Sequence, residues 1–128
     1  MRKALVPIDG SAPARRAVRH IVELALLHPS IEAVLLHVQT GVGALEEQPG
    51  DNSVLRDGGE ALAAADLHCT SVLATGPAAE TITRVAREYG CDAIVMGTRG
   101  LSAFSSVWLG SVSSGVLHLS DLPVTLIR

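Results

Sequence analysis

Short apolar runs, each bounded by glycine, proline or aspartate, recur along the chain and alternate with segments of helical periodicity. The runs are rich in leucine, alanine or β-branched residues and are apolar on both faces. This pattern is typical of strands in a parallel sheet that is covered on both sides. The predicted strands are 3–8, 31–38, 69–74, 93–96 and Val124–Ile127.

The first helix is expected after the turn formed by Asp9 and Gly10. Ser11 can serve as its N-cap, and Pro13 is tolerated in a first helical turn. Apolar residues then recur at helical spacing up to Pro29, which marks the end of the helix.

Two further helices are expected nearer the C-terminus. One covers 80–89, with Glu80 and Arg84 as an i,i+4 pair on its outer side and Gly90 at the C′ position. The other covers 110–119.

The segment 39–66 contains five glycines and Pro49, and we expect most of it to be loop. Within it, only 60–65 is expected to be helical. Strands and helices that alternate in this way imply right-handed βαβ units and a doubly wound α/β fold.

The composition indicates a folded domain and argues against several classes of partner. A length of 128 residues predicts a single domain over 1–128, and 48% apolar with 18% charged residues argue against disorder. Ten Lys+Arg against thirteen Asp+Glu, with three aromatic residues, argue against a nucleic-acid partner. No apolar run approaches the ~20 residues of a membrane span, so we expect no membrane partner. The N-terminal residues do not resemble an export signal, so the expected compartment is the cytoplasm.

The cysteines and histidines show no metal or nucleophile pattern. Cys69 and Cys91 form no CxxC motif and are expected to be reduced, buried thiols. The five histidines are scattered, and His37, in a predicted strand, is interpreted as a packed side chain.

Two turns follow predicted strands at the edge of the sheet where ligands bind in such folds. The first is Pro7-Ile8-Asp9-Gly10-Ser11, and the second is Met96-Gly97-Thr98-Arg99-Gly100. Gly97 and Gly100 allow backbone N–H groups to approach a ligand without interference from a Cβ atom. Arg99 is the one lysine or arginine between Arg87 and Arg128.

The helix that begins at Gly110 strengthens the case for a phosphate site. Its first amides are unpaired and its dipole favours an anion, while Ser111 and Ser113 add hydroxyl donors. The pattern is not a P-loop, because no Gly-Lys-Ser/Thr follows the glycines, and it lacks the third glycine of the dinucleotide fingerprint. No G-x-S-x-G elbow is present either.

The spacing Gly97-x2-Gly100-x9-Gly110-Ser111 resembles the nucleotide-binding motif of the universal stress protein family. Further blocks agree with that family in order along the chain: 6–11, 35–38, 76–78, 92–97, 110–113 and 123–127. The resemblance implies a five-stranded parallel, Rossmann-like sheet in the order 3-2-1-4-5. It also implies binding of ATP, ADP or AMP, with Mg²⁺ or Mn²⁺ bridging the phosphates.

The resemblance also implies roles for particular residues. Those expected to line the nucleotide cleft are Pro7, Ile8 and Asp9, with the Val38 backbone at the adenine edge. Those expected to wrap the ribose and phosphates are Met96, Gly97, Arg99 and Gly100. Those expected to hold the phosphate tail are Gly110, Ser111, Val112 and Ser113. A homodimer through the edge strand Val124–Ile127 and a regulatory protein partner are further expectations.

Each role has a purely structural alternative. Asp9 can form an Asx-turn, Ser111 can be an ordinary N-cap, and Arg99 can be a solvated turn residue. Gly97 and Gly100 can be turn glycines with positive φ. The segment 101–109 also contains no lysine or arginine, unlike many relatives, so phosphate charge must be met by amides, hydroxyls, Arg99 and metal.

The favoured interpretation is a regulatory or sensor module of the stress response that binds ATP and is at most a slow ATPase, with no catalytic residue and no protein metal site. An alternative is a nucleotide-independent interaction module of the same fold, acting through its dimer and partner surfaces. A third is an enzyme of the related adenine-nucleotide hydrolase group, whose additional motifs in the first strand turn are missing here.

Overall fold

The structure is a computed structural model that describes residues 1–39, 47–98 and 110–128. Its strands form one parallel sheet in the order β3-β2-β1-β4-β5. The strands are β1 (Lys3–Pro7), β2 (Glu32–Gln39), β3 (His68–Thr75), β4 (Ala93–Gly97) and β5 (Val124–Ile127). The helices are α1 (Ala12–Leu27), α2 (Ser53–Ala64), α3 (Ala78–Glu88) and α4 (Ser111–Leu119), with a short 3-10 turn η2 (Pro49–Asp51). The expected α/β fold class and strand order are confirmed.

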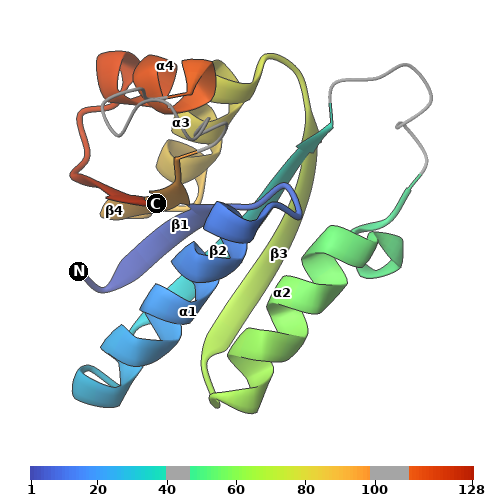
Figure 1. The fold of residues 1–128 in the computed structure, drawn as a ribbon, viewed down its shortest axis with the longest axis vertical. Coiled ribbons are helices and arrows are strands. Elements are labelled where there is room, and N and C mark those ends of the chain that lie inside the picture. The colour runs from blue at the N-terminus through green and yellow to red at the C-terminus, as the bar shows by residue number, and fades with distance from the viewer. Residues whose placement is uncertain (40–46, 99–109) are drawn as a thin grey trace.

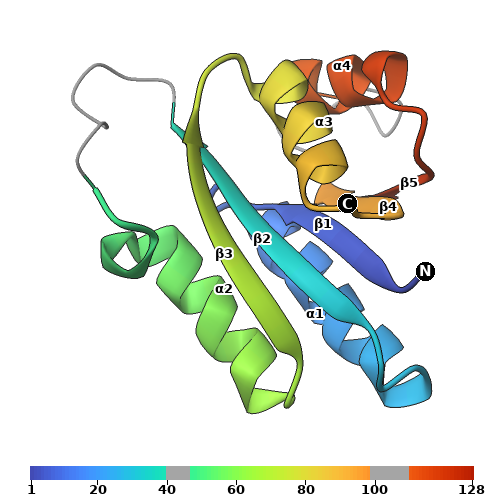
Figure 2. The ribbon, with the colours of Figure 1, turned by 180° about the vertical axis from the view of Figure 1, so that it is seen from behind.

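The helices cover the sheet from both sides. Helices α1 and α2 lie in front of the sheet in Figure 1, and α3 and α4 lie on the opposite face, which is turned toward the viewer in Figure 2. Alternation along the strands sorts the core into two layers. In β1, Ala4 and Val6 pack with α1 and α2, whereas Leu5 packs with α3 and α4.

Helix α2 is longer than the sequence suggested, and the expected loop over 53–59 is wrong. The Asn52 side chain caps the helix by accepting a hydrogen bond from the Leu55 amide at 3.1 Å. A Cβ atom at Gly58 would lie 2.9 Å from Ile8 Cδ1, so this glycine lets the helix approach the sheet. Tertiary packing and a good cap therefore outweigh the low helix propensity of glycine.

The other helix ends agree with the sequence more closely. Ser11 caps α1 by accepting a hydrogen bond from the Ala14 amide at 3.3 Å, and Gly90 follows α3 with a φ of +68°. The expected partner of Arg84 is wrong, however, because its guanidinium pairs with Glu88 at 2.9 Å. Glu80 instead lies in the first turn of α3, where the helix dipole favours a carboxylate.

Both cysteine thiols are free in the structure, as expected, and Cys91 is buried, but the expected full burial of Cys69 is wrong because this residue is half-buried. Burial raises the pKa of Cys69 and of Cys91, which keeps both thiols protonated. No helix within the described ranges is long and apolar enough to cross a membrane.

Asp92 ties the start of β1 to the start of β4. Its carboxylate accepts hydrogen bonds from the Arg2 amide at 2.8 Å and from the Lys3 amide at 3.3 Å. Partial burial opposes the charge, but the two N–H donors and the nearby positive charges outweigh it and lower the pKa of Asp92. A carboxyl group whose pKa is lowered on folding stabilises the protein above its unfolded pKa.

We expect Asp92→Ala to lower the free energy of unfolding at pH 7 by up to about 1 kcal/mol, because solvent screens this exposed group. The charge-dependent part of that difference should be lost as the pH falls through the folded pKa of Asp92, below the reference value of 3.8. Urea unfolding of both proteins at several pH values checks this. The exposed Asp57→Ala serves as a control, and an equal loss in the control would contradict the assigned cause.

Candidate functional site

The chain changes direction across the sheet between β1 and β4. Strand β1 pairs with β2 on one side and with β4 on the other, although β2 and β3 precede β4 in the sequence. The carboxyl ends of two adjacent strands at such a switch point leave a crevice where ligands bind in open α/β sheets. The candidate site is therefore the edge where β1 and β4 end and α4 begins.

The turn after β1 is held in a defined shape. Asp9 is exposed, and its Oδ1 accepts a hydrogen bond from the Ser11 amide at 3.0 Å. Gly10 has a φ of +82°, which a side chain would strain. The Asx-turn alternative for Asp9 is thus confirmed, and the turn places its carboxyl group at the sheet edge.

His37 has a role that the packing interpretation missed. Its Nδ1 lies 2.8 Å from the Ile8 carbonyl oxygen and donates a hydrogen bond to it, so β2 holds the end of β1 in place. The Ile8 amide in turn donates to the Leu36 carbonyl at 2.8 Å. A polar residue near the carboxyl end of a buried strand was the available signal.

We expect His37→Phe to lower the free energy of unfolding by about 1 kcal/mol, because the Ile8 carbonyl loses its side-chain donor. Thermal or urea unfolding measures the change. The matched control is His68→Phe at the exposed start of β3, where the change should stay below about 0.5 kcal/mol. Equal losses in the two variants would contradict a specific role for the Ile8 bond.

The end of β4 forms hydrogen bonds with β5 and α4 and packs closely against the start of α1. The Thr98 amide donates a hydrogen bond to the Ile127 carbonyl at 2.7 Å. The Ser113 hydroxyl donates a longer hydrogen bond, 3.5 Å, to the Gly97 carbonyl. A Cβ atom at Gly97 would lie 2.5 Å from the carbonyl carbon of Pro13, at the start of α1. Gly97 is not among the glycines with positive φ, so that alternative is wrong for this residue, and close packing explains the glycine.

Helix α4 begins without a side-chain cap. Gly110 is the N-cap residue, so the alternative of Ser111 as an ordinary N-cap is wrong; Ser111 is the first helical residue and is exposed. The first turn contains no acidic residue. In contrast, Ser11 and Asn52 cap α1 and α2 with their side chains. Within the part of the chain that the structure describes, no side chain caps the first amides of α4, so they remain available to an anion.

The predicted site residues divide between the two faces of the sheet. Val38, Met96 and Val112 belong to the apolar layer beneath α3 and α4, and strand alternation places Pro7 on the same face as Leu5. The side chain of Ile8 lies on the opposite face, within the α1–α2 layer, and is 7% exposed. Only the backbone of Ile8 remains for the cleft. Arg99 and Gly100 lie outside the described residues.

The described site residues carry one carboxyl group, that of Asp9, and no lysine or arginine. Within 1–39, 47–98 and 110–128, no group of three or more His, Cys, Asp or Glu side chains could hold a metal ion. A divalent cation at this site would therefore depend on ligands supplied by a bound phosphate group.

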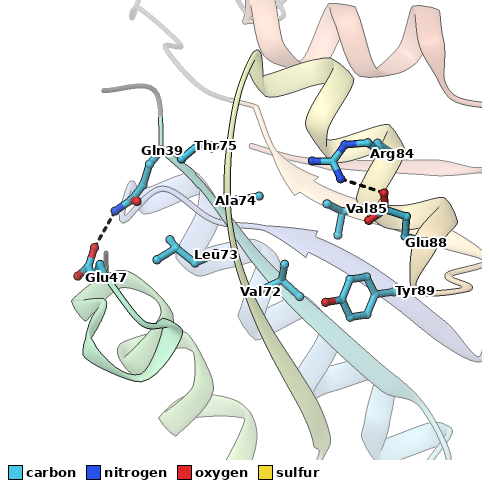
Figure 3. A pocket seen from close by; sticks show the side chains of 10 residues that line it. All are labelled: Gln39, Glu47, Val72, Leu73, Ala74, Thr75, Arg84, Val85, Glu88 and Tyr89. Atoms are coloured by element: carbon cyan, nitrogen blue, oxygen red, sulfur yellow. Dashed lines mark hydrogen bonds and ion pairs between the residues drawn. The ribbon is translucent and has the colours of Figure 1, made fainter. Parts of the chain in front are cut away.

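A separate hollow of about 370 Å³ lies at the outer edge of β3 (Figure 3). Its charged side chains already have partners, since Glu47 accepts a hydrogen bond from Gln39 at 2.7 Å and Arg84 forms an ion pair with Glu88 at 2.9 Å. Figure 3 shows these two pairs on opposite sides of β3. Because Arg84 has a carboxylate partner already, this hollow is a weaker phosphate site than the start of α4.

Comparisons with known proteins match the whole chain. The family model described as "Universal stress protein family" matches residues 1–128. Universal stress protein YxiE of Bacillus subtilis is 34% identical, with 98% of both chains covered. The solved structure of protein MJ0577 is 26% identical and superposes with a TM-score of 0.82, over 98% of this chain and 94% of that chain.

Two further structural neighbours contain nucleotides. The universal stress protein from Archaeoglobus fulgidus in complex with dAMP has a TM-score of 0.75 at 22% identity, over 100% of this chain and 98% of that chain. An Arabidopsis thaliana family protein with AMP bound has a TM-score of 0.76 at 21% identity, over 99% of this chain and 91% of that chain. At these identities the likeness shows a shared fold.

Proposed function

The chain belongs to the universal stress protein family, and on this premise we propose that it binds an adenine nucleotide, ATP, ADP or AMP, and acts as a regulatory or sensor module. The observation that carries the proposal is the start of α4, which has neither a side-chain cap nor an acidic residue in its first turn. Structural neighbours with AMP and dAMP bound support an adenine ligand.

The proposed adenine site lies on the face of the sheet that α3 and α4 cover. Pro7 and Val38 are half-buried and offer aliphatic surface there, whereas Met96 is 4% exposed and would contact the ligand through its backbone. The backbone of Val38 is the proposed hydrogen-bonding partner of the adenine edge. Aromatic residues make up 2% of the chain, so the ring would be held by aliphatic contact and backbone polarity instead of stacking.

The proposed phosphate site uses the N-terminus of α4. The amides of the first turn, from Ser111 to Ser113, and the exposed Ser111 hydroxyl act as donors, and the helix dipole favours the negative charge. The backbone of Gly97, with Arg99 and Gly100, completes the proposed phosphate contacts. Mg²⁺ or Mn²⁺ would enter with the nucleotide and bridge its phosphates.

We propose that this module is not a fast catalyst. Asp9 is the one carboxyl group at the described site, and it already accepts a hydrogen bond from the Ser11 amide. A general base must be within reach of the attacking water and free to take its proton. Nucleotide would instead bias the conformation or a partner surface, with hydrolysis at most slow.

Release of bound nucleotide by heat tests this function. Purified protein, denatured and analysed by chromatography, should release an adenine nucleotide or take one up after incubation with Mg·ATP. In Gly110→Val the uptake should be lost, because the Cβ branch covers the first amides of α4. The backbone of Gly110, with φ −63° and ψ 159°, accepts valine, so the fold should persist. Equal uptake by the folded variant would contradict the assigned site.

A nucleotide-independent interaction module is the second candidate. Strand β5 pairs with β4 alone among the described strands, which leaves an open edge at Val124–Ile127 for a homodimer. The absence of lysine and arginine from 101–109 also favours weak phosphate binding. A protein partner captured equally by the wild type and by Gly110→Val would support this candidate, and loss of capture by the variant would contradict it.

A further inference from the structure

A groove runs between α1 and α2, on the face of the sheet opposite the proposed nucleotide cleft. Figure 1 shows these two helices side by side in front of the sheet. The volume of the groove is about 400 Å³, which is within the range of small-molecule sites. Four of its lining residues have small side chains or none, which leaves the space between the two helices unfilled. These residues are Gly10, Ala14, Gly58 and Ala61.

The floor of the groove is apolar. Ile8, Ala14 and Val18 form it and are 7%, 5% and 6% exposed. Val22 and Val54 extend the apolar surface along the two helices. An apolar ligand body placed here would be removed from water on the sheet side and on both helix sides.

The rim of the groove carries an excess of positive charge. Arg15 and Arg19 lie one helical turn apart on α1, and Asp57 lies across the groove on α2. Arg15 donates to the Gly10 carbonyl at 2.6 Å. The described residues contain one ion pair, between Arg84 and Glu88, so neither rim arginine is neutralised by a carboxylate within 4.0 Å.

We propose that this groove binds an amphipathic anion, an apolar chain or aromatic body that ends in one carboxylate or sulfonate group. The apolar body would lie along Val18 and Val54, and the anionic group would contact Arg15 and Arg19. A nucleotide fits less well, because Ser11 and Asn52 already cap the two helices that form the groove. The site shares Ile8 and Gly10 with the turn after β1, but it lies on the opposite face of the sheet from the proposed nucleotide cleft and goes beyond the proposed function.

Fluorescence titration with anilinonaphthalene sulfonate tests the proposal, because this probe joins an aromatic body to one sulfonate. We expect saturable binding of about one probe per chain, displaced by decanoate and not by Mg·ATP. Displacement by Mg·ATP alone would place the probe in the nucleotide cleft and overturn the proposal, as would the absence of saturable binding.

Matched variants locate the probe. Ala61→Trp fills the groove and should weaken binding at least about tenfold, whereas Ala63→Trp, at an equally exposed position of the same helix that does not line the groove, should not. Arg19→Gln should weaken binding about fivefold, and Arg56→Gln, which does not line the groove, should leave it unchanged. Circular dichroism establishes that each variant is folded. Equal effects of the two tryptophan variants would show non-specific binding and overturn the proposal.

Discussion

Replacing Gly97 with valine should lower the free energy of unfolding by about 3 kcal/mol. The added Cβ atom would lie 2.5 Å from the Pro13 carbonyl carbon and 2.8 Å from the Ala14 nitrogen. Both are backbone atoms at the start of α1, so relief requires a shift of the whole helix. Urea unfolding of the two proteins measures the difference.

Gly50 provides the matched control for this substitution. A Cβ atom there would meet nothing within 4 Å, so Gly50→Val should change the free energy of unfolding by less than about 0.5 kcal/mol. A small loss in Gly97→Val would contradict the packing explanation. Because Gly97 is required by the fold, loss of ligand binding in this variant would not by itself identify a site.

Ser111→Glu should change protein stability and nucleotide affinity in opposite directions. A carboxylate in the first turn of α4 interacts favourably with the helix dipole, so the substitution should raise the free energy of unfolding by about 0.5 kcal/mol. The same charge would lie beside the proposed phosphate site and should weaken nucleotide binding at least about tenfold. Calorimetric titration and urea unfolding of the same preparation measure both effects.

The control for this variant is Ser53→Glu, at the first residue of α2, which is also exposed. It adds the same charge at a comparable helix position, but on the helix that covers the opposite face of the sheet from α4, so nucleotide affinity should stay within about twofold of the wild type. If both variants bind nucleotide as the wild type does, the phosphates do not lie at the start of α4.

The strands and their order were predictable, because each run is apolar on both faces and the ordered motif blocks carry the topology. The face of each site residue was also accessible from alternation, since Ile8 follows Val6 by two positions and Pro7 follows Leu5 by two. The length of α2 could not be predicted, because a glycine such as Gly58 indicates a loop until its close approach to Ile8 is known.

Features that depend on contacts distant in sequence were missed for the same reason. The bond from His37 to the Ile8 carbonyl joins two strands, and the close contact of Gly97 with Pro13 joins β4 to α1. The cap of α4 was a local uncertainty, since Gly110 and Ser111 are both acceptable N-cap residues and differ by one position.

The central claim is that an adenine nucleotide binds where β1 and β4 end and α4 begins. Isothermal titration of the wild-type chain with AMP and with Mg·ATP tests it most directly. We expect saturable heat with one site per chain for at least one of these nucleotides, and a loss of that heat in Ser111→Glu. An absence of heat with both nucleotides up to about 1 mM, a concentration that would detect even weak binding, would contradict it.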